Sequence, residues 1–112
     1  MGTVTPFPFA PPVQVGFDRT ELTRILDLYG RLVAAGHWRD YAVSMGADLA
    51  VFAAFRRASE RPEIRIEKRP ALRAKQGAFA LISEHGLVLK RGHDLNAVLA
   101  PLERRLMRLV AE

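Results

Sequence analysis

The sequence predicts an α+β domain: a twisted antiparallel sheet of four or five strands, with an N-terminal and a C-terminal helix packed on one face. Apolar residues recur at helical spacing near both ends of the chain, over residues 17–36 and again after Asp94. Between these segments the apolar spacing changes to two, which is typical of half-buried strands. The intervening turns are short, so the strands are expected to pair antiparallel.

The first helix is expected over residues 17–36. Asp18 is its expected N-cap, and Glu21 three positions later completes a capping-box pattern. Gly36 supplies a left-handed stop. Gly30 lies inside the helix and predicts close approach of another backbone. The apolar stripe consists of Leu22, Ile25, Leu26, Tyr29, Leu32 and Val33.

Four or five strands are expected, two of them around a turn at Gly46-Ala47-Asp48. Phe52 and Phe55 alternate with apolar neighbours and are expected in the core, whereas Trp38 and Tyr41 could lie exposed. Residues 71–76 fit either a basic loop or one turn of helix. The expected strands span residues 39–45, 49–56, 63–69, 77–83 and 87–91.

A last helix is expected after Asp94, its N-cap candidate. Pro101 interrupts the helical pattern, and two outcomes are open: the helix kinks there, or a first turn ends and a new helix begins with Pro101 at its first position. We favour the second. The apolar stripe consists of Leu95, Val98, Leu99, Leu102, Leu106, Leu109 and Val110.

The chain has 112 residues, which predicts one domain over residues 15–112 behind a proline-rich tail over residues 1–14. It has no cysteine, which excludes disulfides, thiolate metal sites and cysteine nucleophiles. No apolar run reaches the length of a membrane span, and the N-terminus lacks a basic signal-peptide start. We therefore expect a cytoplasmic protein without a membrane partner.

Four stretches of the sequence carry a resemblance to known proteins: FDRTELTRILDLYGRLVAAGHWRDYAV, FRRASERPEIRIEKRP, KQGAFALIS and GLVLKRGHDL. They resemble a bacterial family of uncharacterised proteins, domain of unknown function 2794. The resemblance runs from about Phe17 to Leu99 and implies a small bacterial cytosolic protein. It implies no catalytic or binding residues.

The positive charge is regional. Residues 56–93 hold ten basic and four acidic residues, whereas the rest of the chain holds seven and eight, which together give the net charge of +5. Such a concentration favours anionic partners, nucleic acid among them. The candidate phosphate contacts are Arg56, Arg57, Arg61, Arg65, Arg69, Arg73, Lys75, Lys90 and Arg91.

No motif for catalysis stands out. Ser44, Ser59 and Ser83 lie outside a nucleophile elbow, and no histidine pair has metal-ligand spacing on a helix. Glycine-rich phosphate loops are missing as well. We expect no enzyme, cofactor, metal or small-molecule substrate.

Two binding hypotheses follow. The first is a non-enzymatic, regulatory or binding module that meets nucleic acid through the residue 56–91 region. The alternative is a protein-interaction module, such as a homodimer, that acts through an exposed sheet edge or the last helix. The alternative is favoured by four apolar residues that exceed what a short terminal helix must bury: Leu102, Leu106, Leu109 and Val110.

Overall fold

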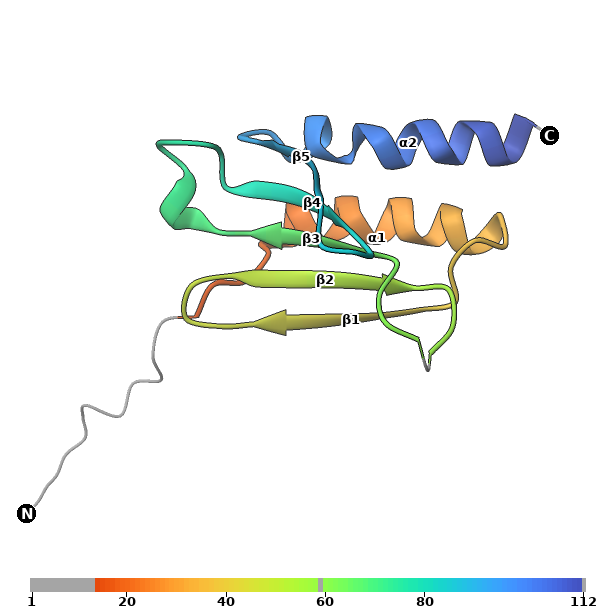
Figure 1. The fold of residues 1–112 in the computed structure, drawn as a ribbon, viewed down its shortest axis with the longest axis horizontal. Helices are drawn as coiled ribbons and strands as arrows, with labels where there is room; N and C mark the ends of the chain where they lie inside the picture. The colour runs from red at the N-terminus through yellow and green to blue at the C-terminus, as the bar shows by residue number, and fades with distance from the viewer. Residues whose placement is uncertain (1–13, 59, 112) are drawn as a thin grey trace, which may run out of the picture.

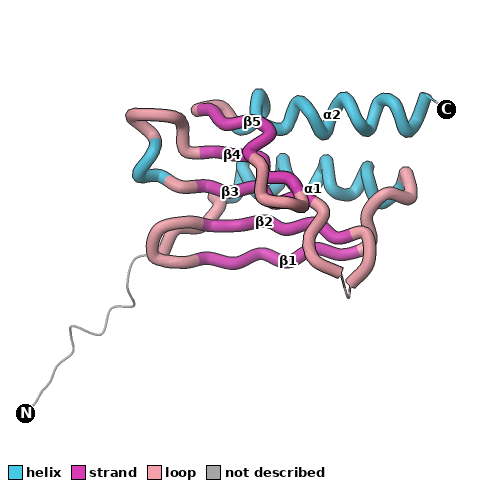
Figure 2. Tube along the Cα trace, in the orientation of Figure 1, coloured by secondary structure: helices cyan, strands magenta, loops and turns pink. Residues whose placement is uncertain are grey.

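A computed structural model describes residues 14–58 and 60–111 and confirms the predicted fold class. One five-stranded antiparallel sheet lies between an N-terminal and a C-terminal helix in the chain (Figures 1 and 2). The predicted tail, residues 1–14, falls almost entirely outside the described residues. The elements are α1 (Arg19–Ala34), β1 (Asp40–Met45), β2 (Ala50–Phe55), β3 (Ile64–Lys68), the short 3-10 helix η2 (Pro70–Leu72), β4 (Phe79–Ser83), β5 (Val88–Gly92) and α2 (Leu95–Ala111).

The sheet is a meander with strand order β1-β2-β3-β4-β5. Each strand pairs with its neighbour along the chain, and β1 and β5 form the two edges (Figure 1). The register places Val43 opposite Phe52, Phe52 opposite Ile66, and Ile66 opposite Leu81. Opposed residues point to the same side, so these side chains share one face of the sheet.

Both helices pack on that face. Phe52, Ile66 and Leu81 are buried in one core cluster with apolar side chains of α1 and α2. The helix residues in the cluster are Ile25, Leu28 and Leu32 of α1, and Leu95, Val98, Leu99, Leu102 and Leu106 of α2. The opposite side of the sheet, which we call the open face, has no helix over it in the described chain.

The two helices run in the same direction (Figure 1). Glu21 in the first turn of α1 meets Lys68 at the end of β3, with Oε1 2.7 Å from Nζ. Arg105 in the second half of α2 meets Glu63, just before β3 begins. The sheet therefore has two ends. We call the end with Lys68 the crossover end, because residues 69–78 link β3 to β4 there. We call the opposite end the Glu63 end.

The start of α1 agrees with the sequence. The backbone N–H of Glu21 donates to Asp18 Oδ1 at 2.8 Å, and the N–H of Asp18 donates to Glu21 Oε1 at 2.9 Å. Gly36 has φ +80° and follows the helix, as predicted. The expectation for Gly30 is wrong: nothing lies within 4 Å of a Cβ built there, so no other backbone approaches it closely.

The expectation that a new helix begins at Pro101 is wrong. The helix α2 is continuous from Leu95 to Ala111, with Pro101 inside it. Proline removes one backbone donor, which leaves the carbonyl of Ala97 without its usual helical partner. Burial of Leu99 and Leu102 on either side of Pro101 fixes both halves against the sheet and compensates this loss.

The aromatic residues after α1 differ partly from expectation. Trp38 is 2% exposed and belongs to the core, whereas Tyr41 on β1 is 43% exposed. The Tyr29 ring lies 5.8 Å from Trp38 and 5.0 Å from Tyr41. Burial, and secondarily the negative charge of Asp40 and the neighbouring Tyr41, raises the pKa of Tyr29 above its ordinary value.

Candidate nucleic-acid interface

The nine predicted contacts do not form one patch. Arg56, Arg57 and Arg61 lie in the connection between β2 and β3, at the Glu63 end. Arg69, Arg73 and Lys75 lie in the connection between β3 and β4, at the crossover end. The five residues of β3 separate these connections by about 13 Å. Sequence proximity therefore overstated how closely the cations gather.

At the Glu63 end, one carboxylate accepts two hydrogen bonds and lies beside two further basic side chains. Trp38 Nε1 donates to Glu63 Oε1 at 2.6 Å, and Arg105 Nη1 donates to the same oxygen at 3.0 Å. His37 Nε2 also lies 3.0 Å from this oxygen. Arg56 Nε lies 3.5 Å from Oε2. The Glu63 side chain is only 15% exposed, so this cluster joins three parts of the fold.

Sequence reasoning missed this cluster. Residues 37, 63 and 105 are far apart in the chain, and no local spacing brings them together. The His37 imidazole lies between Glu63 and Arg105, whose Nη1 is 3.1 Å from Nε2. The signal was tertiary, so only the structure could supply it.

Two further predicted contacts have acidic neighbours. Arg61 Nε lies 3.4 Å from an oxygen of Glu84, and Arg65 Nε lies 3.7 Å from an oxygen of Glu67. Both arginines are partly or largely exposed, so each pair stabilises the fold little. The carboxylates nevertheless reduce the local potential that a phosphate would meet.

The remaining predicted contacts have no carboxylate oxygen within 4.0 Å among residues 14–58 and 60–111. Arg57 is one of them, and it lies at the Glu63 end. The others lie on the β3–β4 connection and on β5, and we call them the crossover cluster: Arg69, Arg73, Lys75, Lys90 and Arg91.

Two glycines bring the parts of the crossover cluster together. Gly77 has φ +101°, and a Cβ built on it would lie 2.2 Å from the backbone carbon of Gly92. The end of the β3–β4 connection therefore rests directly on the end of β5. Arg91 immediately precedes Gly92 and pairs with Ala80 of β4. Only glycine at position 77 permits this approach.

The open face of the sheet has a small apolar surface beside the crossover cluster. Ala80 and Ile82 point away from the helices, yet they are 0% and 4% exposed. Larger side chains of the same face surround them, since Arg65 is opposite Ile82 and Arg91 is opposite Ala80. Figure 1 views the sheet from this side, with α1 behind it. The open face thus has two small apolar residues with an arginine beside each of them.

The ends of the two helices add little to anion binding. Asp94 Oδ1 accepts the backbone N–H of Asn96 at 3.1 Å, as expected for a residue at the start of α2. Asp18 and Glu21 do the same for α1. A cavity of about 250 Å³ lies beside these carboxylates and is also lined by Arg73 and His93. Its mixed charge does not favour a phosphate.

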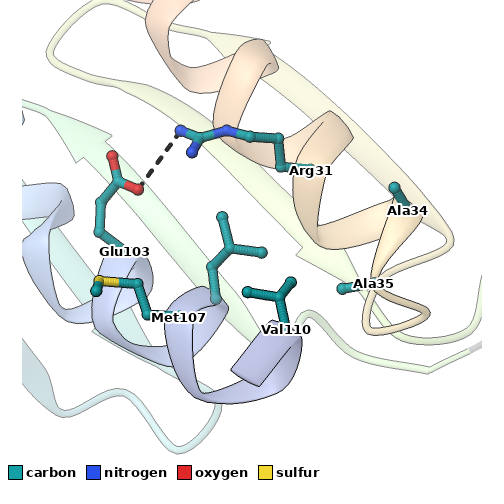
Figure 3. A pocket seen from close by; sticks show the side chains of 7 residues that line it. Arg31, Ala34, Ala35, Glu103, Met107 and Val110 are labelled. Carbon is teal, nitrogen blue, oxygen red and sulfur yellow. Dashed lines mark hydrogen bonds and ion pairs between the residues drawn. The ribbon is translucent and has the colours of Figure 1, made fainter. Parts of the chain in front are cut away.

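A groove runs between the second halves of the helices (Figure 3). It has a volume of about 430 Å³, and Ala34, Ala35 and Val110 form much of its lining. Arg31 Nη2 and Glu103 Oε1 face each other across it at 3.4 Å. The groove is mainly apolar and lies away from the crossover cluster.

Residues 14–58 and 60–111 contain neither a cluster of metal-ligating side chains nor a helix that could cross a membrane. No group of three or more His, Asp or Glu side chains there could hold a metal ion. Neither α1 nor α2 has the length and apolar character that crossing a bilayer requires.

Comparison with known proteins gives one match. A family model described as "Protein of unknown function (DUF2794)" matches residues 15–99, which confirms the resemblance noted in the sequence. No curated protein and no solved structure matches.

Proposed function

The chain belongs to the DUF2794 family, which is described as being of unknown function, and we propose that it is a small nucleic-acid-binding module. The observation that carries the proposal is the crossover cluster, defined above: its five cations have no carboxylate oxygen within 4.0 Å among residues 14–58 and 60–111. Cations that no internal acid neutralises attract phosphate groups most strongly.

The surface around the cluster supports the same proposal. Arg73, Lys75 and Lys90 are exposed, so phosphates can reach them. Arg91 pairs with Ala80 and points to the open face, whereas Lys90 pairs with Leu81 and points to the helix side. Phe55 is the one phenylalanine on the open face of β2 and is half buried, so base stacking contributes little. Binding is therefore expected to be dominated by phosphate contacts, with weak sequence preference.

The test is fluorescence anisotropy with labelled single-stranded DNA, duplex DNA and RNA over a series of salt concentrations. The variant Arg73→Glu/Lys75→Glu removes two contacts of the crossover cluster. The matched control is Arg104→Glu/Arg108→Glu on α2, which changes the net charge equally and also replaces exposed residues. The slope of log K against log salt should fall by about 1.4 to 1.8 for the first variant and little for the control.

Two results would contradict the proposal. If both variants lose affinity equally, the net charge and not the crossover cluster determines binding. If the unmodified protein binds none of the three nucleic acids at physiological salt, the cluster has another partner. Circular dichroism of each variant verifies that the fold is retained.

A further inference from the structure

The outer edge of β1 differs from every other part of the sheet. All six residues of β1 are exposed. Three of them point to the helix side and remain well exposed there: Tyr41 is 43%, Val43 41% and Met45 59% exposed. The two helices pack over strands farther along the sheet, so β1 extends beyond the core that they cover.

Backbone groups of β1 also face outward. Gly46 N–H donates to Leu49 O at 3.0 Å. This hydrogen bond determines which residue pairs of β1 and β2 are hydrogen-bonded and which are not. Because hydrogen-bonded and non-hydrogen-bonded pairs alternate, Tyr41 and Val43 turn their N–H and C=O groups away from β2. The N–H of Tyr41 accordingly donates to the side chain of its neighbour Asp40, at 2.8 Å. Among the described residues, no strand pairs with this edge between residues 40 and 44.

The edge carries none of the usual protection. Natural edge strands commonly carry lysine, proline or a bulge that prevents pairing with another chain. Residues 40–55 contain two aspartates and no lysine, arginine or proline. The β1–β2 pairing is regular over its six residue pairs. The edge strand is therefore regularly paired on its inner side and uncharged over residues 41–45, and none of the described strands pairs with its outer side over residues 40–44.

We propose that β1 pairs antiparallel with β1 of a second copy, so that two sheets join into one of ten strands. The charge distribution favours a second copy as the occupant. The chain carries +5 overall, yet residues 40–55 carry only acids, so two copies meet at their least basic surface. The crossover clusters of both copies then remain free.

The strand is complementary to itself. Val15 already bridges to Gly46, which leaves residues 40–44 for a partner. A two-fold axis at Ala42 places Tyr41 against Val43 of the other copy on the helix side. It also places Asp40 against Ser44, a carboxylate against a hydroxyl donor. Both contacts occur twice, as in an isologous interface.

The absence of cysteine from the chain makes a direct test possible. In the proposed pairing, Ala42 lies opposite its own counterpart at a spacing that a disulfide can bridge. Ala42→Cys should form a disulfide-linked dimer under mild oxidation. The control is Val88→Cys, an exposed residue on the other edge strand, which should remain monomeric on a non-reducing gel.

Analytical ultracentrifugation over a concentration series supplies the second measurement. The unmodified protein should reach a dimer, and Val43→Lys should shift it to the monomer, whereas Val88→Lys should not. A monomer at all concentrations, or equal cross-linking of Ala42→Cys and Val88→Cys, overturns the proposal. Co-purification of a foreign peptide on β1 would also overturn it. These outcomes are independent of the anisotropy result, because nucleic acid is absent from both measurements.

Discussion

The two ends of the sheet use the same kind of residue in opposite ways. At the Glu63 end, a carboxylate accepts hydrogen bonds from Trp38 and Arg105 and lies beside His37, so that the positive charge of Arg105 is used to join α2 to the sheet. At the crossover end, five cations have no such partner in the described chain. A local excess of arginine therefore does not by itself define a binding surface. What matters is which guanidinium groups the fold has already neutralised.

The largest expected effect concerns the backbone of the crossover end. Gly77→Ala should destabilise the protein by about 4 kcal/mol, because the new Cβ combines a left-handed backbone with a clash against Gly92. Gly86→Ala is the matched control: its φ is +87°, but no atom lies within 4 Å of the added Cβ. The control should cost only about 1 kcal/mol.

Thermal and urea unfolding measure both glycine variants. Equal losses for Gly77→Ala and Gly86→Ala would show that φ alone matters and that the connection does not rest tightly on β5. The crossover cluster would then be less fixed than the structure indicates.

Glu63→Ala should have the next largest effect, a loss of about 3 kcal/mol. It leaves the buried Trp38 N–H and the Arg105 guanidinium without their acceptor. Glu84→Ala removes a carboxylate of the same kind from Arg61, but that pair is exposed, and the loss should stay below about 0.5 kcal/mol. Urea unfolding gives both values. Similar losses would mean that the Glu63 cluster is not a structural clamp.

Single truncations compare the two ends in nucleic-acid binding. Arg73→Ala should lower the salt slope measured by anisotropy by about 0.7 to 0.9, the contribution of one phosphate contact. Arg56→Ala should lower it less, since Glu63 already neutralises that guanidinium. The reverse order would place the binding surface at the Glu63 end and contradict the assignment to the crossover cluster.

The smallest expected effect is an alkaline one at the Glu63 end. The folded protein raises the pKa of Tyr29 above the ordinary value of 10.0, so it favours the neutral phenol. Stability from this source is full below pH 10.0 and is lost as the pH rises through the higher folded pKa. Tyr29→Phe should reduce this alkaline loss. An unchanged stability profile between pH 9 and 12, measured by urea unfolding, would assign the alkaline loss to other groups.

The sequence predicted what depends on local pattern. The capping box at Asp18, the apolar spacing of two between the helices, and the glycine turns all follow from neighbours along the chain, and the fold class followed from them. The prediction that a new helix begins at Pro101 was wrong, because the burial of apolar side chains on both sides of Pro101 outweighs the loss of one hydrogen bond. Trp38 proved to be buried because its N–H finds a partner in Glu63, 25 residues away in the sequence.

The candidate site was less predictable because it too depends on contacts between residues that are distant in the sequence. Composition identified the basic residues but not their acidic partners. The pairing of Arg61 with Glu84 depends on two connections that meet only when β3 and β4 pair. The approach of Gly77 to Gly92 likewise has no signal in the spacing of residues. Tertiary contacts divided one sequence cluster into neutralised and free cations.

The strand order has a consequence for how the chain folds. Every ladder joins consecutive strands, so each hairpin can form from residues that are close along the chain. Contacts between the chain ends, such as Arg24 with Glu103, belong to helix packing and close a long loop. Low contact order in the sheet favours rapid folding, with the docking of α1 on α2 as the slower step. In a single copy of the chain, the edge strands β1 and β5 can each open without breaking another ladder, so their amides should exchange first among those of the sheet.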